Sequence, residues 1–254
     1  MSNVRNELRR KEICKLLEMK KHMSVNALAE RFTVSAMTIR RDLDMLEDQQ
    51  MLRREHGRAV YIAPHTDVAQ YDARLHEDTA AKAHIAQMAL PFLAGVESIY
   101  LDGSTTSNAL LSAIPDDITL TVYTNSLPAL NMLVSRPRLK AFMFGGMLSE
   151  SMQYLDSTSS LFRRNDIFVD IAFISCTGYD PQRIINHNIL PVNERRIMLK
   201  NANKRFLLAD SKKRGKSGMF TVCGWDSIDG FITNEQPDAE MTKSLTGHGV
   251  QIIY

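Results

Sequence analysis

The chain of 254 residues has few cysteines, a single tryptophan and no long apolar run. Its three cysteines, Cys14, Cys176 and Cys223, lie far apart, and an odd number does not form a disulfide framework. We therefore expect reduced thiols and a cytoplasmic protein. No cysteine has a histidine nearby at the spacing of zinc ligands, so neither a metal site nor a cofactor is predicted.

The sequence also lacks candidate membrane-spanning and secretory segments. No stretch approaches the roughly 18 consecutive apolar residues that a membrane-spanning helix needs. The most apolar stretch, residues 88–96, is short and contains Pro91 and Gly95. The N-terminal residues are basic, but no apolar run follows them, which argues against a secretory signal. We expect no membrane partner.

The charge is unevenly distributed along the chain. The net charge is only +2, yet residues 1–60 hold more Lys and Arg than Asp and Glu, and the remainder is slightly acidic. A basic end on a nearly neutral body is typical of a polyanion-binding module joined to a domain with another task.

The first sixty residues predict three short helices. Ser24 is a good N-cap for the second helix, which ends near Phe32, and Ser35 is an N-cap for the third after a short turn. The apolar residues at helical spacing are Leu8, Ile13, Leu16 and Leu17 in the first helix (residues 5–17), Val25, Leu28 and Ala29 in the second, and Ile39, Leu43 and Leu46 in the third. The last two helices predict a helix-turn-helix over residues 23–42.

The exposed face of the third helix has the side chains of a recognition helix. Arg donates two hydrogen bonds to a guanine edge or pairs with phosphate, and Ser or Thr hydroxyls reach phosphate or bases. The predicted DNA-contacting residues of this helix are Ser35, Met37, Thr38, Arg40 and Arg41. Asp42 and Asp44 would repel phosphate, so they should point back toward the protein or the first helix.

A basic β-hairpin is predicted directly after this helix. Residues 52–62 have strand-forming side chains on both sides of a turn at His56-Gly57. Such a hairpin is the wing of a winged helix-turn-helix, and it would place Arg53, Arg54 or Arg58 on the flanking DNA backbone. The predicted DNA-binding residues of the wing are Arg54, His56 and Arg58.

These residues resemble the DeoR-type bacterial regulators. That family pairs Val-Ser-x-x-Thr-Ile-Arg-Arg-Asp-Leu with a downstream Arg-x-His-Gly-Gly-Ala, and this chain has the first motif at residues 34–43 and Arg-Glu-His-Gly-Arg-Ala at residues 54–59. Arg58 replaces the second glycine of the motif and adds a cation for phosphate. We predict a DNA-binding domain over residues 1–62 and a linker over residues 63–75.

The remaining chain, residues 76–254, predicts an α/β domain with an open, mostly parallel sheet. Short β-rich runs alternate with helical stretches, at residues 98–101, 119–123, 141–144, 171–175, 205–208, 230–233 and 250–253. In such sheets ligands bind at the carboxyl ends of the strands. Three strand ends are followed by polar or glycine residues, at 102–106, 124–126 and 145–146. Small hydroxyl residues at a helix N-terminus favour an anion site.

The DeoR resemblance extends through this domain. It implies a sensor fold similar to sugar-phosphate isomerases and CoA transferases, assembly into dimers or tetramers, and an effector that is a phosphorylated sugar. The matched residues that it implies for the effector site are Asp102, Gly103, Ser104, Thr105, Thr106, Asn125, Gly146, Glu194, Lys200 and Lys213.

Three functions remain open at this point. The resemblance implies a repressor of a carbohydrate catabolic operon that leaves its operator when a phosphorylated sugar accumulates, although activation is also compatible with the sequence. An isomerase-like enzyme would use Glu194 or Asp102 as a base. An architectural DNA-binding protein would bind no small molecule. A tethered DNA-binding module favours the regulator, because fold analogy alone does not establish catalysis.

Overall fold

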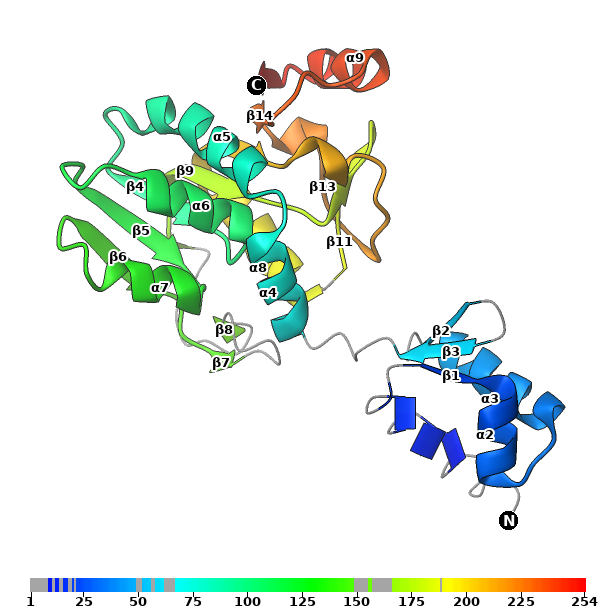
Figure 1. Cartoon of the computed structure of the whole chain (residues 1–254). Coiled ribbons are helices and arrows are strands. Elements are labelled where there is room, and N and C mark those ends of the chain that lie inside the picture. The colour runs from blue at the N-terminus through cyan, green and yellow to red at the C-terminus, as the bar shows by residue number, and fades with distance from the viewer. Residues whose placement is uncertain are drawn as a thin grey trace. The chain divides into compact units, whose positions relative to one another are not determined.

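The computed structural model describes residues 9, 10, 12, 13, 16, 17, 20, 22–48, 52–55, 58–61, 67–148, 155, 156, 166–187 and 189–254. The chain divides into two compact units, Met1–Thr66 and Asp67–Tyr254 (Figure 1). No helix among the residues described is long and apolar enough to cross a membrane.

The first unit contains the predicted helix-turn-helix. Helix α2 spans Val25–Phe32, and the Ser24 hydroxyl accepts a hydrogen bond from the Ala27 amide at its start. Helix α3 spans Ala36–Asp48, and the Ser35 hydroxyl accepts one from the Thr38 amide. Between the helices, Thr33 has a φ of 52°, which turns the chain sharply enough for the two helices to pack. Both predicted N-caps are confirmed.

A three-stranded sheet completes this unit. Strands β2 (Leu52–Glu55) and β3 (Arg58–Tyr61) form the predicted antiparallel hairpin. Strand β1 (His22–Ser24), which the sequence analysis did not predict, pairs with the other edge of β3. Helices followed by a hairpin that is anchored on a short strand make a winged helix.

An apolar core joins these elements. It contains the predicted stripe of α3 and residues of α2, β2 and β3, and those described in the predicted first helix are helical and add to it. The buried residues are Ile13, Leu17, Val25, Leu28, Ile39, Leu43, Leu46, Leu52 and Ala59.

The second unit is built on a parallel sheet of seven strands. Their order is β15-β14-β12-β9-β4-β5-β6, and every pairing is parallel. The strands are β4 (Ser98–Leu101), β5 (Leu120–Thr124), β6 (Leu139–Met143), β9 (Val169–Ile174), β12 (Ala202–Leu208), β14 (Gly230–Ile232) and β15 (Gln251–Ile253). All seven coincide with the predicted runs, and the predicted α/β class is confirmed.

Helices cover both faces of this sheet, so the central strands are apolar on both sides. Helices α5 (Thr79–Ala89), α6 (Thr105–Ala113) and α7 (Leu127–Leu133) pack on one face, where Ile99 and Leu101 point. Helices α8 (Ile189–Lys200) and α9 (Ala239–Gly247) belong to the core of the other face, where Tyr100 points (Figure 1).

Two smaller sheets flank the second face and the strand ends. Strands β10 (Gly178–Tyr179), β11 (Arg183–Asn186) and β13 (Phe220–Gly224) form an antiparallel sheet. Strands β7 (Met147–Leu148) and β8 (Leu155–Asp156) form a short pair.

The predicted linker is largely a helix. Helix α4 spans Asp67–His76 and belongs to the second unit, so residues 67–75 of the predicted linker are wrongly assigned, and residues 63–66 lie outside the described residues. The helix was missed because its apolar pattern is weak. Among its described side chains only Tyr71 is buried, while Leu75 is 43% exposed.

Candidate functional site

A pocket opens at the carboxyl ends of four neighbouring strands of the parallel sheet. Asp102 follows β4, Asn125 follows β5, Cys176 lies just beyond β9, and Asp210 lies just beyond β12. The chain runs outward from β4 to β6 and then returns to place β9 on the other side of β4. The pocket therefore lies where the strand order reverses, which is the usual ligand site of open α/β sheets.

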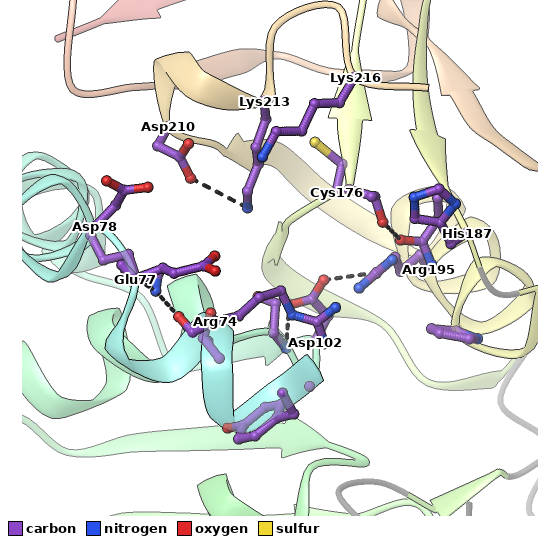
Figure 2. Close-up of a pocket in the computed structure, with 18 of the residues that line it drawn as sticks. Arg74, Glu77, Asp78, Asp102, Cys176, His187, Arg195, Asp210, Lys213 and Lys216 are labelled. Carbon is purple, nitrogen blue, oxygen red and sulfur yellow. Dashed lines mark hydrogen bonds and ion pairs between the residues drawn. The ribbon is translucent and has the colours of Figure 1, made fainter. Parts of the chain in front are cut away.

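The cavity is small and strongly charged. Its volume is about 220 Å³, below the roughly 300–1,000 Å³ of sites for drug-sized ligands. Figure 2 shows the labelled charged residues surrounding a central space, and they come from helices, strand ends and loops far apart in sequence. The cations of the lining are Arg74, Lys82, Arg195, Lys213 and Lys216, and the acids are Glu77, Asp78, Asp102 and Asp210.

Asp102 and Arg195 form a buried ion pair in this lining. The Arg195 Nε donates to Asp102 Oδ2 over 2.7 Å, and both side chains are less than 10% exposed. The Ser175 amide also donates to Asp102 Oδ2, at 2.8 Å. The other oxygen, Oδ1, accepts from the Ser107 hydroxyl at 2.6 Å and from the Ser104 amide at 3.2 Å.

These contacts decide the protonation of Asp102. Burial alone would raise the pKa of this carboxyl group, but the Arg195 guanidinium and the hydrogen bonds from Ser104, Ser107 and Ser175 outweigh it and lower the pKa below its ordinary value. Burial would lower the pKa of Arg195, but the charge of Asp102, the neighbouring Tyr100 and Cys176 and the hydrogen bond to Asp102 together outweigh it and raise the pKa. Both groups stay charged at neutral pH.

One nitrogen of the buried guanidinium has no partner in the described part of the chain. Arg195 is 6% exposed and lines the pocket, and its Nη1 makes no hydrogen bond to any described residue. An unpaired buried N–H of a cation costs more than that of a neutral group. This nitrogen marks the position where an acceptor atom of a ligand would be stabilised.

Lys213 and the start of α6 supply further donors. The Lys213 ammonium donates to Ser175 Oγ at 2.9 Å and lies 3.6 Å from Asp210 Oδ2. Helix α6 is capped by the Ser104 hydroxyl, which accepts from the Ser107 amide. The amides of Thr105 and Thr106, in the first turn, have no acceptor within the helix. Cations and helix N-terminal amides together favour an anionic ligand.

The predicted effector residues fall into three groups. Six of them line the cavity, namely Asp102, Gly103, Ser104, Thr105, Asn125 and Lys213. Thr106 and Glu194 are buried behind the wall, where Thr106 Oγ1 lies 3.4 Å from the Lys213 ammonium. Gly146 and Lys200 are exposed and do not line it, because Gly146 lies beyond β6 and Lys200 ends α8, more than a turn past Arg195.

Glu194 has a structural environment rather than a catalytic one. Its Oε1 accepts from the Tyr100 hydroxyl at 2.9 Å and its Oε2 from Asn125 Nδ2 at 3.1 Å. A general base must lie within hydrogen-bond reach of the substrate proton. Glu194 does not line the cavity, and both oxygens of Asp102, whose pKa is lowered, already accept hydrogen bonds. Neither carboxylate is placed to abstract a proton.

Several residues of the wall were not predicted from the sequence. Arg195 is the most important of them. Its neighbours Glu194 and Arg196 also have charged side chains, so the sequence alone did not indicate which of the three faces the pocket. Asn186 and His187 come from β11 and the residue after it, in a sheet that was not predicted. Arg74 and Lys82 also line the pocket, and the predicted set did not include them.

The second candidate surface is the exposed face of α3. Arg40 and Arg41 are exposed on this helix, and Met37, in its first turn, is 57% exposed. Ser35 is also exposed, and its hydroxyl caps the helix and contacts the Thr38 hydroxyl at 2.9 Å. The predicted face of the helix is therefore free of apolar packing at its N-terminal half, where a recognition helix meets base edges.

Asp42 of α3 is turned toward the protein, as predicted, whereas Asp44, for which the same was predicted, is exposed. The Asp42 carboxylate is buried and forms an ion pair with Arg9 at 2.6 Å and another with Arg10 at 3.5 Å. Both arginines are thereby drawn to the protein. In the wing, Arg54 and Arg58 lie on β2 and β3, but their side chains and all of His56 lie outside the described residues.

Across the described ranges, no group of three or more His, Cys, Asp or Glu side chains is arranged to hold a metal ion.

A winged helix-turn-helix joined to an α/β domain with a charged pocket defines a DNA-binding transcriptional regulator with a sensor domain. Residues 9–65 match the DeoR-like helix-turn-helix domain, and residues 77–235 match the DeoR C terminal sensor domain. The chain belongs to the DeoR family and is a regulator, not an enzyme.

Relatives with assigned names match almost the whole chain. The L-fucose operon activator of Haemophilus influenzae is 29% identical over 99% of both chains. The glycerol-3-phosphate regulon repressor of Escherichia coli is 24% identical over 94% of this chain and 95% of its own. Among solved structures, ribose 5-phosphate isomerase A of Neisseria gonorrhoeae is 14% identical over 52% of both chains, with a TM-score of 0.38.

Proposed function

We propose that this protein acts in the cytoplasm as a repressor of a carbohydrate catabolic operon and leaves its operator when a phosphorylated sugar binds the pocket. The observation that carries the effector class is the Nη1 of buried Arg195, which has no hydrogen-bond partner among the described residues and lies in the same wall as Lys213 and the first turn of α6. A phosphoryl group supplies several anionic acceptors, and cations and helix N-termini bind such groups well.

Carboxylate and amide oxygens in the same pocket support a sugar as the remainder of the ligand. Asp210 and Asn125 line the cavity, and carboxylate or amide oxygens accept hydrogen bonds from hydroxyl groups. The small cavity volume favours a metabolite of a few carbon atoms. Two of the relatives, by their names, regulate a fucose operon and a glycerol-3-phosphate regulon, which supports a role in carbohydrate use.

DNA binding would use the exposed face of α3 in the major groove and the wing on the backbone. The predicted contacts are Ser35, Met37, Thr38, Arg40 and Arg41 from the helix and Arg54, His56 and Arg58 from the wing. Operators recognised by such helices are usually palindromic, so we propose at least a dimer, with a tetramer as the larger assembly that the family resemblance implies.

A thermal-shift panel tests the effector class. The panel compares glycerol 3-phosphate, ribose 5-phosphate, fructose 1-phosphate and glucose 6-phosphate with the matching unphosphorylated compounds. A ligand at 100 times its Kd contributes about 2.7 kcal/mol to stability. We expect stabilisation by at least one phosphorylated compound and none by its unphosphorylated partner. Equal stabilisation by both would contradict the assignment of the cationic wall to phosphate.

Two further measurements test regulation. Binding to duplex DNA from the chain's own upstream region should weaken steeply with salt and be reversed by the stabilising sugar phosphate. A promoter fusion in a deletion strain tests the sign, because loss of a repressor raises expression and loss of an activator lowers it. Lower expression in the deletion strain would replace repression by activation and leave the effector site unaffected.

A further inference from the structure

Helix α4 connects the pocket to the start of the sensor unit. It begins at Asp67, the first residue of that unit, so it follows the DNA-binding unit directly in the chain. Its residues Tyr71 and Arg74 line the pocket, and the turn after it adds Glu77 and Asp78. This short helix thus follows the DNA-binding unit in the sequence and also forms one wall of the cavity.

Among the side chains of α4 that are described, one is buried and the last turn is exposed. Tyr71 is buried and its hydroxyl accepts from Asn108 Nδ2 at 2.6 Å, but Arg74, Leu75 and His76 are exposed. A helix of this length has little stability of its own and depends on contacts with the rest of the unit. The polar contacts at the end of α4 are among those that keep it in place.

Lys82 makes those contacts. Its ammonium, on α5, donates to the backbone carbonyl oxygens of Arg74 and Glu77, in the last turn of α4 and just after it. Carbonyl groups at a helix C-terminus lack partners within the helix and carry partial negative charge, so a cation there is stabilising. The Lys82 side chain therefore holds the end of the helix from inside the sensor unit.

The same ammonium faces the effector pocket. Lys82 is 6% exposed and lines the cavity. An ammonium group has three N–H donors, and the two carbonyl contacts leave one for a ligand. Burial and the nearby Lys213 ammonium lower the pKa of Lys82, so two cations repel one another here when no anion is bound. An anionic ligand would relieve this repulsion and favour the charged form of Lys82.

We propose that Lys82 binds the anionic group of the effector with its remaining N–H while it keeps the end of α4, so that effector binding locks α4 onto the sensor unit. This inference rests on the proposed function of the pocket. The ligand shifts the equilibrium because it binds the docked arrangement, in which Lys82 is positioned, better than the released one. Since α4 is the first element of the sensor unit after the DNA-binding unit in the chain, its docking is the step that would link effector binding to DNA binding.

Hydrogen exchange of the full-length protein tests the lock, with inorganic phosphate as the probe and chloride at equal ionic strength as the reference. The reporter is the amide of Glu77, which donates to the Ala73 carbonyl at 3.1 Å, together with its neighbours in residues 73–79. We expect phosphate to slow exchange there in the wild-type protein. Lys82→Met should speed exchange about tenfold without phosphate, the effect of losing a charged hydrogen bond, and remove the phosphate response.

The control is Lys243→Met, which removes the same charge from an exposed position on α9. It should leave exchange at residues 73–79 and its phosphate response unchanged. If Lys82→Met does not fold, the wild-type protein alone still tests the lock, because the lock requires slower exchange at residues 73–79 when phosphate is present.

The outcomes separate this inference from the proposed function. If sugar phosphates or phosphate stabilise the protein but exchange at residues 73–79 is unchanged or faster, the lock is wrong and the effector pocket stands. An equal phosphate response in Lys82→Met overturns the role of Lys82. If no phosphorylated compound stabilises the protein, the proposed effector and the lock fall together.

Discussion

The Asp102 carboxylate and the Arg195 guanidinium join the end of β4 to helix α8 across 2.7 Å in the wall of the pocket. A second pair in the same unit, Arg205 and Asp229, has the same 2.7 Å separation but is about a third exposed. The second pair is more exposed, although it is bidentate and Asp229 Oδ2 also accepts from the Arg205 amide. Breaking a buried pair leaves one charge uncompensated, whereas exposed pairs contribute little.

This contrast predicts unequal losses of stability. Asp102→Asn should lower the free energy of unfolding by about 3–5 kcal/mol, because Arg195 stays charged and buried. Asp229→Asn, the matched control, should cost roughly 1 kcal/mol. Urea unfolding of both variants and the wild-type protein at neutral pH measures the difference. Equal losses would mean that Asp102 is not the main partner of Arg195 in solution.

The same variant predicts a pH dependence. The pKa of Asp102 is lowered in the folded protein, so the folded state holds the ionised form better than the unfolded chain does. The contribution of Asp102 to folding stability is fully present above the pKa of an unperturbed Asp, about 3.9. It is lost as the pH falls below that value toward the lower pKa of the folded state. The stability gap between wild type and Asp102→Asn should therefore be constant from pH 7 to 5 and shrink in more acidic solution.

Arg41 provides the test of the DNA-binding helix. Arg41→Ala should weaken operator binding about 5- to 150-fold if the guanidinium contacts a guanine edge, because such a contact contributes about 1–3 kcal/mol. If Arg41 contacts phosphate instead, the slope of log K against log salt should fall by about one. Fluorescence anisotropy with labelled operator at several salt concentrations distinguishes the two.

The control for this measurement is Arg138→Ala, an exposed arginine of the sensor unit. It should leave both affinity and salt slope unchanged. Wild-type affinity in Arg41→Ala would remove this residue from the interface and require Arg40 or the wing to supply the specificity.

The helices and strands that were predicted correctly are those that the local sequence pattern determines. The strands have continuous apolar runs because both faces of the sheet are covered, and the helices α2 and α3 begin at serine caps that bond to the first turn. Helix α4 was not predicted, and one of the contacts that hold its end is the bond from the Lys82 ammonium to backbone carbonyl oxygens. No spacing of residue types reports such a contact.

The pocket was predicted in part for a related reason. Asp102 and Asn125 directly follow strands, so the topology of a parallel sheet brings them to one edge. Arg195 and Arg196 are neighbours with the same charge, yet one is buried and the other exposed. Their difference is decided by how α8 packs on the sheet. Lys200, one turn further along the same helix, was placed at the site by resemblance and lies outside it.

Thr105 tests the start of α6 as part of the effector site. Thr105→Val keeps the shape of the side chain and removes a hydroxyl that lines the cavity. It should abolish release from DNA by the sugar phosphate and leave DNA affinity unchanged, because the substitution is in the sensor unit. Thr121→Val, at the opposite end of strand β5, is the matched control and should respond as wild type does. Normal release in Thr105→Val would exclude its hydroxyl from effector binding.

The two described cysteines predict a chemical footprint of the pocket. Burial raises the pKa of Cys176 to about 11 and that of Cys223 to about 12. A thiol with a pKa of about 11 is ionised to about one part in a thousand at pH 8, against roughly a quarter for an unperturbed thiol. Alkylation of both by iodoacetamide should therefore be at least about a hundredfold slower than in the urea-unfolded protein.

Only Cys176 lines the pocket, so the bound sugar phosphate should slow its alkylation further and leave Cys223 unaffected. The comparison within one molecule matters because a ligand also suppresses global unfolding, and that effect would slow both thiols equally. Mass spectrometry of the two peptides over time gives both rates at once. Protection of Cys176 alone places the ligand between the ends of β4 and β9, whereas equal protection of the two thiols would contradict that position.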